Sequence, residues 1–135
     1  MPDAATSERI RTTFEAFFRG DLAGAVAAMT PDVVGYDAPE MPDSGVIHGR
    51  DGVKARLAGF LELFGDLELA DLRMEDVSDR ILVVIHVRGR ARAGEAPVEF
   101  DLAYLLRMRD DGLADEIRSF FTEDGARAYL STNAG

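Results

Sequence analysis

The spacing of apolar residues changes near residue 65, and this change limits the folds available to the chain. Before residue 65, most apolar side chains recur at helical intervals, as at Ile10, Phe14, Phe17 and Phe18. After residue 66 they alternate with polar side chains, which is the period of a strand with one buried face. Early helices followed by a run of strands predict an α+β domain rather than alternating parallel strands and helices.

Two helices are predicted before the first strand. The first carries the four apolar positions named above, has Ser7 as its expected cap and ends at Gly20-Asp21. The second is short, runs from Leu22 to Met29 and is stopped by Thr30-Pro31.

A strand and a long loop precede the third predicted helix. The strand covers Val33 to Asp37, and residues 38–50 contain two prolines and two glycines, which is typical of a loop. Asp51 can cap the third helix, whose end is expected near Gly65.

The second half of the chain predicts four strands and a final short helix. The apolar parity changes near Ala70-Asp71, which indicates a β-bulge, and Asp110-Asp111-Gly112 predicts a hairpin turn. Thr122 can cap a last helix that runs to Leu130. We expect a curved antiparallel or mixed sheet wrapped by three N-terminal helices, in the shape of a cone with its mouth near the loop. Residues 1–135 are expected to form a single domain with an ordered core of about 7–131.

Composition excludes several classes of function. The chain has 25 acidic and 15 basic residues, a net charge of −10, which argues against a nucleic-acid partner. It has no cysteine, which excludes disulfides and thiolate metal sites and fits a cytoplasmic location. No segment approaches the roughly 18 apolar residues of a membrane span, and the N-terminus lacks a signal-peptide pattern, so no membrane partner is expected.

The order of elements, together with several short strings, resembles the nuclear transport factor 2-like superfamily. In pattern the chain is most similar to the Δ5-3-ketosteroid isomerases, from about Arg11 to Phe121. The strings that carry the resemblance are Gly20-Asp21, Pro31-Asp32, Tyr36-Asp37, Ile47-His48-Gly49-Arg50, and Arg107 with the turn ending at Gly112. The resemblance implies a pocket for a steroid- or polyketide-like carbonyl compound and no cofactor.

Asp37 and Tyr104 are the expected catalytic residues. The resemblance implies that Asp37 moves a proton between two carbons of the ligand. The sequence also leaves open that Asp37 only caps the loop through its own backbone. Tyr104 has the parity of the inner sheet face, and its phenol could donate a hydrogen bond to the ligand oxygen, or it could be a core aromatic. Phe14 replaces a family tyrosine, so one expected donor is missing.

An apolar pocket is expected between the helices and the sheet, although the same aromatic residues could simply form a core. His48 is a candidate acid at the pocket rim, or it could instead fix the loop through a hydrogen bond. Two isolated histidines without cysteine make a metal site improbable. The predicted lining is Phe14, Phe17, Phe18, Phe60, Phe64, Met74, Phe100, Ile117, Ser119 and Phe121.

The outer sheet face is a candidate dimer interface. Residues 80–109 carry six basic and three acidic side chains, in contrast to the acidic remainder of the chain. Arg88, Arg90 and Arg92 would face Glu99, Asp101 and Glu116 across a two-fold axis. Ordinary cross-strand pairs on a solvated face are the alternative. Glu116 and Arg118 are expected to form an exposed ion pair on this face.

Two functions remain open at this point. One is an acid–base isomerase or cyclase, with Asp37 as the proton shuttle and Tyr104 as the donor to an enolate oxygen. The other is a ligand-binding or dimerisation module without catalysis. Epoxide hydrolysis, known in the same superfamily, is disfavoured because it needs an inward Asp-Arg-Asp set, and Asp101 has the outward parity.

Overall fold

The computed structural model of the chain describes residues 2–41 and 44–133, which form four helices and six strands. The helices are α1 (Ala4–Phe18), α2 (Leu22–Val26), α3 (Gly49–Glu62) and α4 (Glu123–Asn133). The strands are β1 (Met29–Tyr36), β2 (Val46–His48), β3 (Phe64–Val77), β4 (Arg80–Ala91), β5 (Pro97–Met108) and β6 (Ala114–Phe120). The predicted α+β class, with N-terminal helices and a short C-terminal helix, is confirmed.

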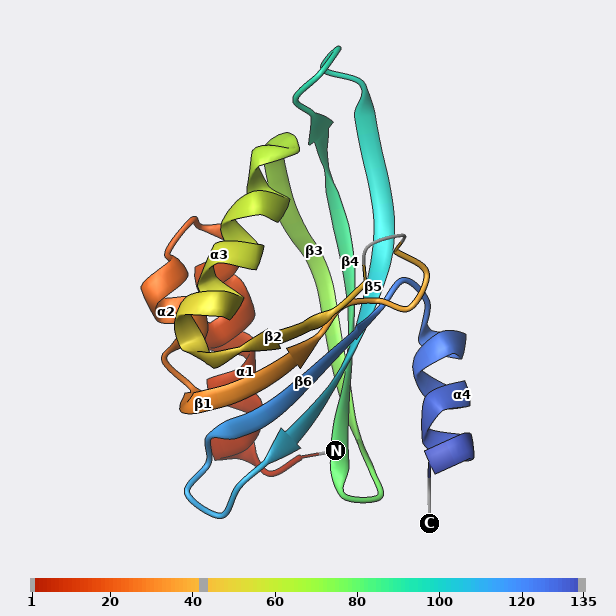
Figure 1. The fold of residues 1–135 in the computed structure, drawn as a ribbon. Coiled ribbons are helices and arrows are strands. Elements are labelled where there is room, and N and C mark those ends of the chain that lie inside the picture. Colours follow the sequence, from red (N-terminus) through yellow and green to blue (C-terminus); the bar gives the residue numbers. More distant parts are fainter. Residues whose placement is uncertain (1, 42–43, 134–135) are drawn as a thin grey trace.

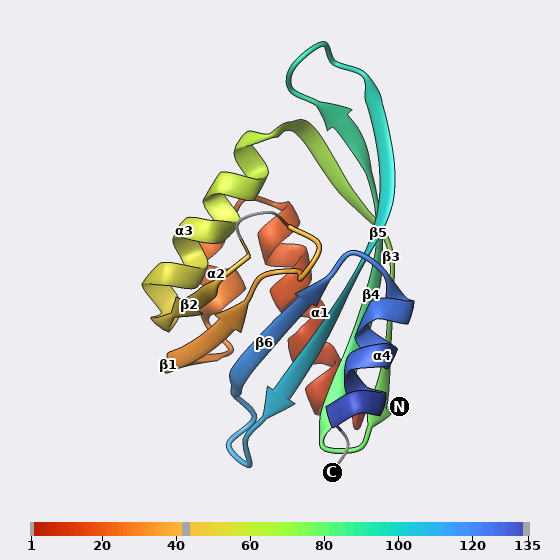
Figure 2. The ribbon, with the colours of Figure 1, turned by 45° about the vertical axis from the view of Figure 1, so that its right-hand side comes forward.

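All six strands form one mixed sheet in the order β2-β1-β6-β5-β4-β3. Only the β1–β6 pair is parallel, and the other neighbours are antiparallel. The sheet separates α1, α2 and α3 on its inner face from α4 on its outer face (Figures 1 and 2). Among the described residues, no helix is long and apolar enough to cross a membrane.

Both faces of the central strands are buried. On the inner face, Val83, Ile85 and Val87 of β4 pack with Ile10 of α1. On the outer face, a second core joins residues of β4, β5 and β6 to Ala126 of α4. α4 covers only part of the outer face. Beneath α4, successive side chains of a strand enter the inner and the outer core in turn, whereas elsewhere they alternate between the inner core and solvent.

The predicted start of the first helix is wrong by several residues. Asp3 caps α1, because its Oδ1 accepts a hydrogen bond from the Thr6 backbone N–H at 2.8 Å. The hydroxyl of Ser7 instead donates to the Pro2 carbonyl at 3.1 Å. α1 therefore begins at Ala4, before the cap predicted at Ser7.

The second helix is shorter than predicted, and the first strand is longer. α2 ends at Val26, whereas Met29 opens β1 and pairs with Ala114 of β6. Pro31 is tolerated because the register of the β1–β6 ladder shifts between Met29 and Val34. A long-range pairing thus overrides the local helical pattern.

The predicted loop at 38–50 contains a strand. β2 pairs with β1, and Gly35 of β1 lies opposite Ile47 of β2. The third helix then begins directly after His48, which is its N-cap, so Asp51 lies in its first turn rather than at its cap. Phe64, expected at the end of this helix, opens β3.

Three local predictions in the second half are confirmed. The register of β3 shifts between Leu69 and Asp71, at the predicted bulge. β5 and β6 form a hairpin through residues 109–113. The hydroxyl of Thr122 accepts a hydrogen bond from the Gly125 N–H at 3.0 Å, as expected of a helix cap.

The predicted ion pair of Glu116 and Arg118 exists, but it is not exposed. Glu116 is 5% exposed, and its carboxylate lies 2.7 Å from Arg80 and 3.1 Å from Arg118. The guanidinium of Arg118 stacks on the rings of Tyr36 and Tyr129, at 3.8 and 4.5 Å from their centroids. Tyr129 belongs to α4, so the packing of this helix on the sheet removes the pair from solvent.

Candidate functional site

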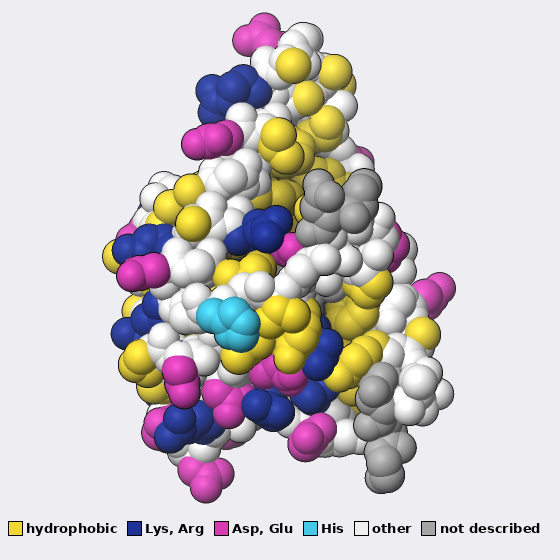
Figure 3. Space-filling model, viewed as in Figure 1, with side chains coloured by type: hydrophobic (Ala, Val, Ile, Leu, Met, Phe, Trp, Pro, Cys, Tyr) yellow, Lys and Arg dark blue, Asp and Glu magenta, His cyan; other side chains and the backbone are white. Residues whose placement is uncertain are grey.

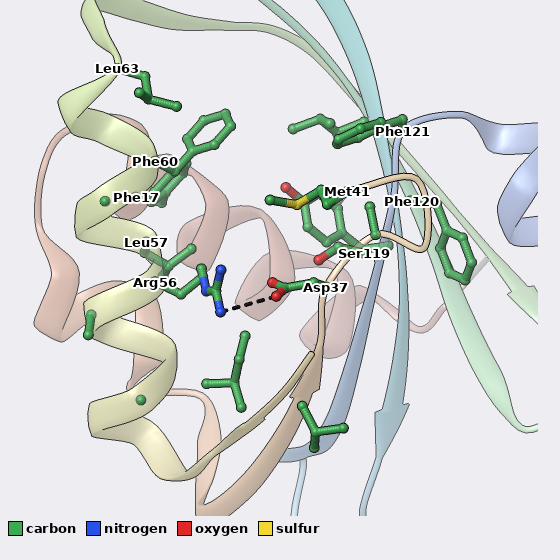
Figure 4. A pocket seen from close by; sticks show the side chains of 18 residues that line it. Phe17, Asp37, Met41, Arg56, Leu57, Phe60, Leu63, Ser119, Phe120 and Phe121 are labelled. Carbon is green, nitrogen blue, oxygen red and sulfur yellow. Dashed lines mark ion pairs between the residues drawn. The ribbon is translucent and has the colours of Figure 1, made fainter. Parts of the chain in front are cut away.

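A cavity of about 690 Å³ lies between α3 and the inner face of the sheet. Hydrophobic side chains gather in the region between α3 and the long strands (Figure 3). Figure 4 shows Phe60 of α3 and Leu63, the C-cap of that helix, across the cavity from Met41, Ser119 and Phe121. The lining is Phe17, Asp37, Ala38, Met41, Val46, Ile47, Gly52, Ala55, Arg56, Leu57, Gly59, Phe60, Leu63, Leu102, Tyr104, Ser119, Phe120 and Phe121.

Asp37 directly follows β1, and its carboxylate points into the cavity (Figure 4). Its side chain is only 6% exposed. The Asp37 backbone N–H donates to the Gly45 carbonyl at 3.1 Å, and the Gly45 N–H donates to Asp37 Oδ2 at 3.2 Å. The loop-capping bond considered from the sequence is thus present, but it occupies one carboxylate oxygen and leaves the group facing the cavity.

Arg56 of α3 is the ion-pair partner of Asp37. Its Nη2 lies 3.1 Å from Asp37 Oδ2, and its side chain is 47% exposed (Figure 4). Burying a charged carboxylate among apolar side chains costs free energy, and the neighbouring guanidinium offsets part of that cost. Sequence reasoning missed Arg56, although its position between Val53 and Phe60 on the inward stripe of the helix was a usable signal.

Tyr104 of β5 and Ser119 of β6 lie directly opposite each other in the β5–β6 ladder. Burial raises the pKa of the Tyr104 phenol well above its usual range, so the phenol stays neutral and able to donate. Its ring packs against Phe14 with the centroids 5.2 Å apart. Among the described residues, the Tyr104 hydroxyl has no hydrogen-bond partner.

A second, smaller cavity of about 100 Å³ lies deeper in the domain, toward α1. Asp37, Arg56, Tyr104 and Ser119 line both cavities. The polar groups of the site are therefore concentrated where the larger cavity meets the smaller one, and the remaining walls are largely apolar.

Six of the ten residues predicted for the pocket line one of these cavities. Phe17, Phe60, Ser119 and Phe121 line the larger cavity, whereas Phe14 and Ile117 line only the smaller one.

Four predicted lining residues line neither cavity. Met74 is buried in the inner core, and Phe18 and Phe100 pack against that core. Phe64 contacts the rings of Phe60 and Phe100, with centroids 5.1 and 5.7 Å apart. Phe64 thus contacts the lining residue Phe60 from outside the cavity, whereas Phe18 and Phe100 belong to the packing around the inner core.

His48 is not part of either cavity, and the acidic residues form no metal site within residues 2–41 and 44–133. His48 is exposed on β2 and does not line either cavity. In this part of the chain, no group of three or more His, Asp or Glu residues could hold a metal ion.

The fold is shared with many solved structures, whereas no curated protein sequence matches the chain. An NTF2-like protein of unknown function from Burkholderia pseudomallei is 25% identical, with a TM-score of 0.76 over 93% of this chain and 95% of that one. TerC, co-crystallised with polyporic acid, is 22% identical, with a TM-score of 0.73 over 93% and 98%. A Mycobacterium tuberculosis protein in complex with estradiol-17β-hemisuccinate is 17% identical, with a TM-score of 0.67 over 90% and 97%.

Sequence comparison identifies the family directly. Residues 10–117 match the SnoaL-like domain, from the middle of α1 to the middle of β6, and this range includes every polar residue of the cavity except Ser119. The chain therefore belongs to the SnoaL-like domain family, with the NTF2-like, ketosteroid isomerase-like fold.

Proposed function

We propose that this SnoaL-like domain binds a small, largely apolar carbonyl compound and catalyses proton transfer on it, as an isomerase or a cyclase. The observation that carries the proposal is the meeting of Asp37 and Tyr104 on one apolar cavity of about 690 Å³. A cavity of this size accepts a ligand of several fused rings. The ligands of the two relatives named above, polyporic acid and estradiol-17β-hemisuccinate, support this class.

The two oxygens of Asp37 suggest how the proton would move. Oδ2 is held by the Gly45 N–H and by Arg56, whereas Oδ1 has no partner among the described residues. Oδ1 would take a proton from the carbon next to the ligand carbonyl. The C–H electron pair would then form a C=C bond, and the carbonyl oxygen would become an enolate that accepts a hydrogen bond from Tyr104.

The fate of the enolate separates the two reaction types. Return of the proton from Asp37 to a different carbon completes an isomerisation. In a cyclisation, the enolate carbon attacks a second carbonyl of the same ligand, which forms a C–C bond and closes a ring. The π electrons of that second carbonyl move to its oxygen, which takes the proton from Asp37 and becomes a hydroxyl. Both reactions need the same base and donor, so the proposal covers both.

Deuterium exchange tests the proposal without knowledge of the natural substrate. In D₂O, the protein is expected to accelerate exchange of the α-hydrogens of 2-tetralone, a flat bicyclic ketone, measured by NMR. Asp37→Asn should lower this rate by about 10² or more and leave the affinity for the ketone nearly unchanged. Asp51→Asn removes an exposed carboxylate of α3 that lines neither cavity, so it should have no effect. Unchanged exchange in Asp37→Asn would overturn the catalytic proposal.

A binding function without catalysis is the second candidate, and the ion pair of Asp37 with Arg56 favours it. One oxygen of the base is already engaged by the guanidinium at 3.1 Å and by a backbone N–H. For a binding protein, ketones should enter the cavity with no exchange above the buffer rate. Tyr104→Phe and Asp37→Asn should then alter affinity alone.

We also propose that two copies associate through the open part of the outer face. Arg88, Glu99 and Asp101 are exposed there. Glu116, expected in this interface, is buried with Arg80 under α4 and is not available. Arg92 is not available for this interface either, because its guanidinium donates hydrogen bonds to the Glu62 and Phe64 carbonyls.

A further inference from the structure

Arg56 uses only part of its hydrogen-bonding capacity. A guanidinium has five N–H donors, yet Arg56 contacts only Asp37 Oδ2 among the described residues. Arg50, on the same helix, is different, because its Nε and Nη2 both donate to the Met29 carbonyl. Arg50 therefore ties α3 to β1, whereas Arg56 retains free donors at the wall of a cavity.

The charge of Arg56 is the single positive charge among the described lining residues, and Asp37 is the single negative one. The Asp37 side chain is 6% exposed and the Arg56 side chain is 47% exposed, so Arg56 is the more solvent-accessible member of the pair. Both side chains line the cavity, so a ligand inside it has the Arg56 guanidinium beside Asp37.

Proton abstraction by Asp37 requires a hydrogen-bond donor for the ligand oxygen close to the carboxylate. The carbonyl oxygen of a ketone is only two bonds from the α-carbon that loses its proton, so the group that binds the oxygen must lie close to the base. Arg56 touches the carboxylate directly at 3.1 Å. Phe14 has no hydroxyl, and Tyr104 alone would leave the enolate oxygen with one donor.

We propose that Arg56 binds the ligand's oxygen and makes the cavity selective for compounds whose oxygen is anionic or becomes anionic in the reaction, namely enols, enolates and acidic ketones. The ring system of such a ligand packs against Phe60, Met41 and Phe121, with its oxygen toward the ion pair (Figure 4). The catalytic part of this role rests on the proposed function, whereas the binding part does not.

Two matched fluorescent probes test the binding part. N-phenyl-1-naphthylamine is neutral, and 8-anilino-1-naphthalenesulfonate has the same rings with one anionic sulfonate. Arg56→Gln is expected to weaken binding of the sulfonate about tenfold, which is the loss of one charge-assisted contact at a partly exposed site. Binding of the neutral probe should stay within about twofold, because the apolar wall remains.

Lys54→Gln is the matched control, since it removes a positive charge from the same helix at a residue that lines neither cavity. It should leave the affinity of both probes unchanged. An equal loss of sulfonate affinity in Lys54→Gln would overturn the proposal, because the effect would then come from net charge alone. An equal loss of both probes in Arg56→Gln would also overturn it, because Arg56 would then only support the wall.

Removal of Arg56 leaves Asp37 as a buried carboxylate without its partner, and this could prevent folding. The comparison is therefore repeated between Asp37→Asn and the double variant Asp37→Asn/Arg56→Gln, neither of which has an unpaired buried charge. The double variant should bind the sulfonate about tenfold more weakly than Asp37→Asn, with the neutral probe unchanged. Equal sulfonate affinity in these two variants would overturn the proposal.

The catalytic part has a separate measurement. For 2-tetralone exchange, Arg56→Gln should lower kcat more than it raises KM, because the oxygen is neutral in the bound ketone and negative in the transition state. Arg56→Lys should recover part of kcat. A rise in KM with kcat unchanged would overturn the catalytic part. If the wild-type protein catalyses no exchange, the proposed function fails, and the two probes still decide whether Arg56 selects anionic oxygen.

Discussion

Tyr104 shows how surroundings set the chemistry of a single residue. Its phenol lies at the cavity wall beside the Phe14 ring, and burial raises its pKa well above the usual range. The charged phenolate is disfavoured because few polar groups are near enough to replace water. A neutral donor is therefore maintained at alkaline pH, which suits an oxygen that gains negative charge.

The raised pKa predicts a loss of stability at alkaline pH. In the unfolded chain Tyr104 ionises near its ordinary pKa of about 10. In the folded protein it stays protonated beyond that pH. The unfolded state therefore releases its proton first, and the free energy of unfolding falls as pH rises above about 10.

Urea unfolding between pH 8 and pH 11 measures this effect. Tyr104→Phe should reduce the decline of the unfolding free energy over that interval. The same decline in the variant and in the wild-type protein would contradict the raised pKa.

At the scale of elements, Gly89 of β4 marks a close approach of two strands. It lies opposite Leu67 of β3, next to the register shift between Phe64 and Asp66. A Cβ atom at Gly89 would come within 1.9 Å of the Asp66 carbonyl oxygen. Only glycine allows the backbone of β3 to approach β4 this closely, near the start of β3 after α3.

Gly89→Ala is therefore expected to destabilise the protein by about 2 kcal/mol or more, because backbone must move to accept the methyl group. Gly59→Ala in α3 is the control, since a Cβ there meets no atom within 4 Å. It should stabilise the protein by about 0.5–1 kcal/mol through helix propensity. Thermal and urea unfolding measure both, and equal stability of the two variants would contradict the close approach.

At the scale of the whole molecule, α4 divides the outer sheet face into two parts. One part is an apolar core that includes Leu105 and Phe120. The other is open and charged, with His86 hydrogen-bonded to Glu99 and Asp101, and with Arg88 3.9 Å from Glu99. These contacts raise the pKa of His86, chiefly through Asp101. The charges are thus already paired within one chain, which limits what they can add to an interface.

The proposed dimer should depend on this open part. Arg88→Glu adds a negative charge beside Glu99 and Asp101 in each copy, so the two copies should repel each other. Association should weaken at least tenfold, measured by sedimentation or light scattering across a range of concentrations. Arg109→Glu, exposed on the β5–β6 turn, should have no effect. A wild-type chain that stays monomeric at high concentration, or an Arg88→Glu chain that still dimerises fully, would contradict the interface.

The sequence by itself determined the features that depend on local periodicity. The change from a helical to a two-residue period predicts the α+β class, and the change of parity at Ala70-Asp71 predicts the bulge. Local chemistry also identifies the Thr122 cap and the hairpin at 110–112. These features follow from neighbouring residues, so they need no knowledge of the remaining chain.

Tertiary structure alone decided the features that depend on distant residues. β2 has three residues, too few for a pattern, and it exists because β1 offers a free edge. Glu116 is buried because α4 packs over it, although its parity is outward. Arg56 reaches Asp37 because α3 lies across the end of β1. The sequence singled out Asp37, but its partner and its free oxygen result from long-range packing, which local patterns do not encode.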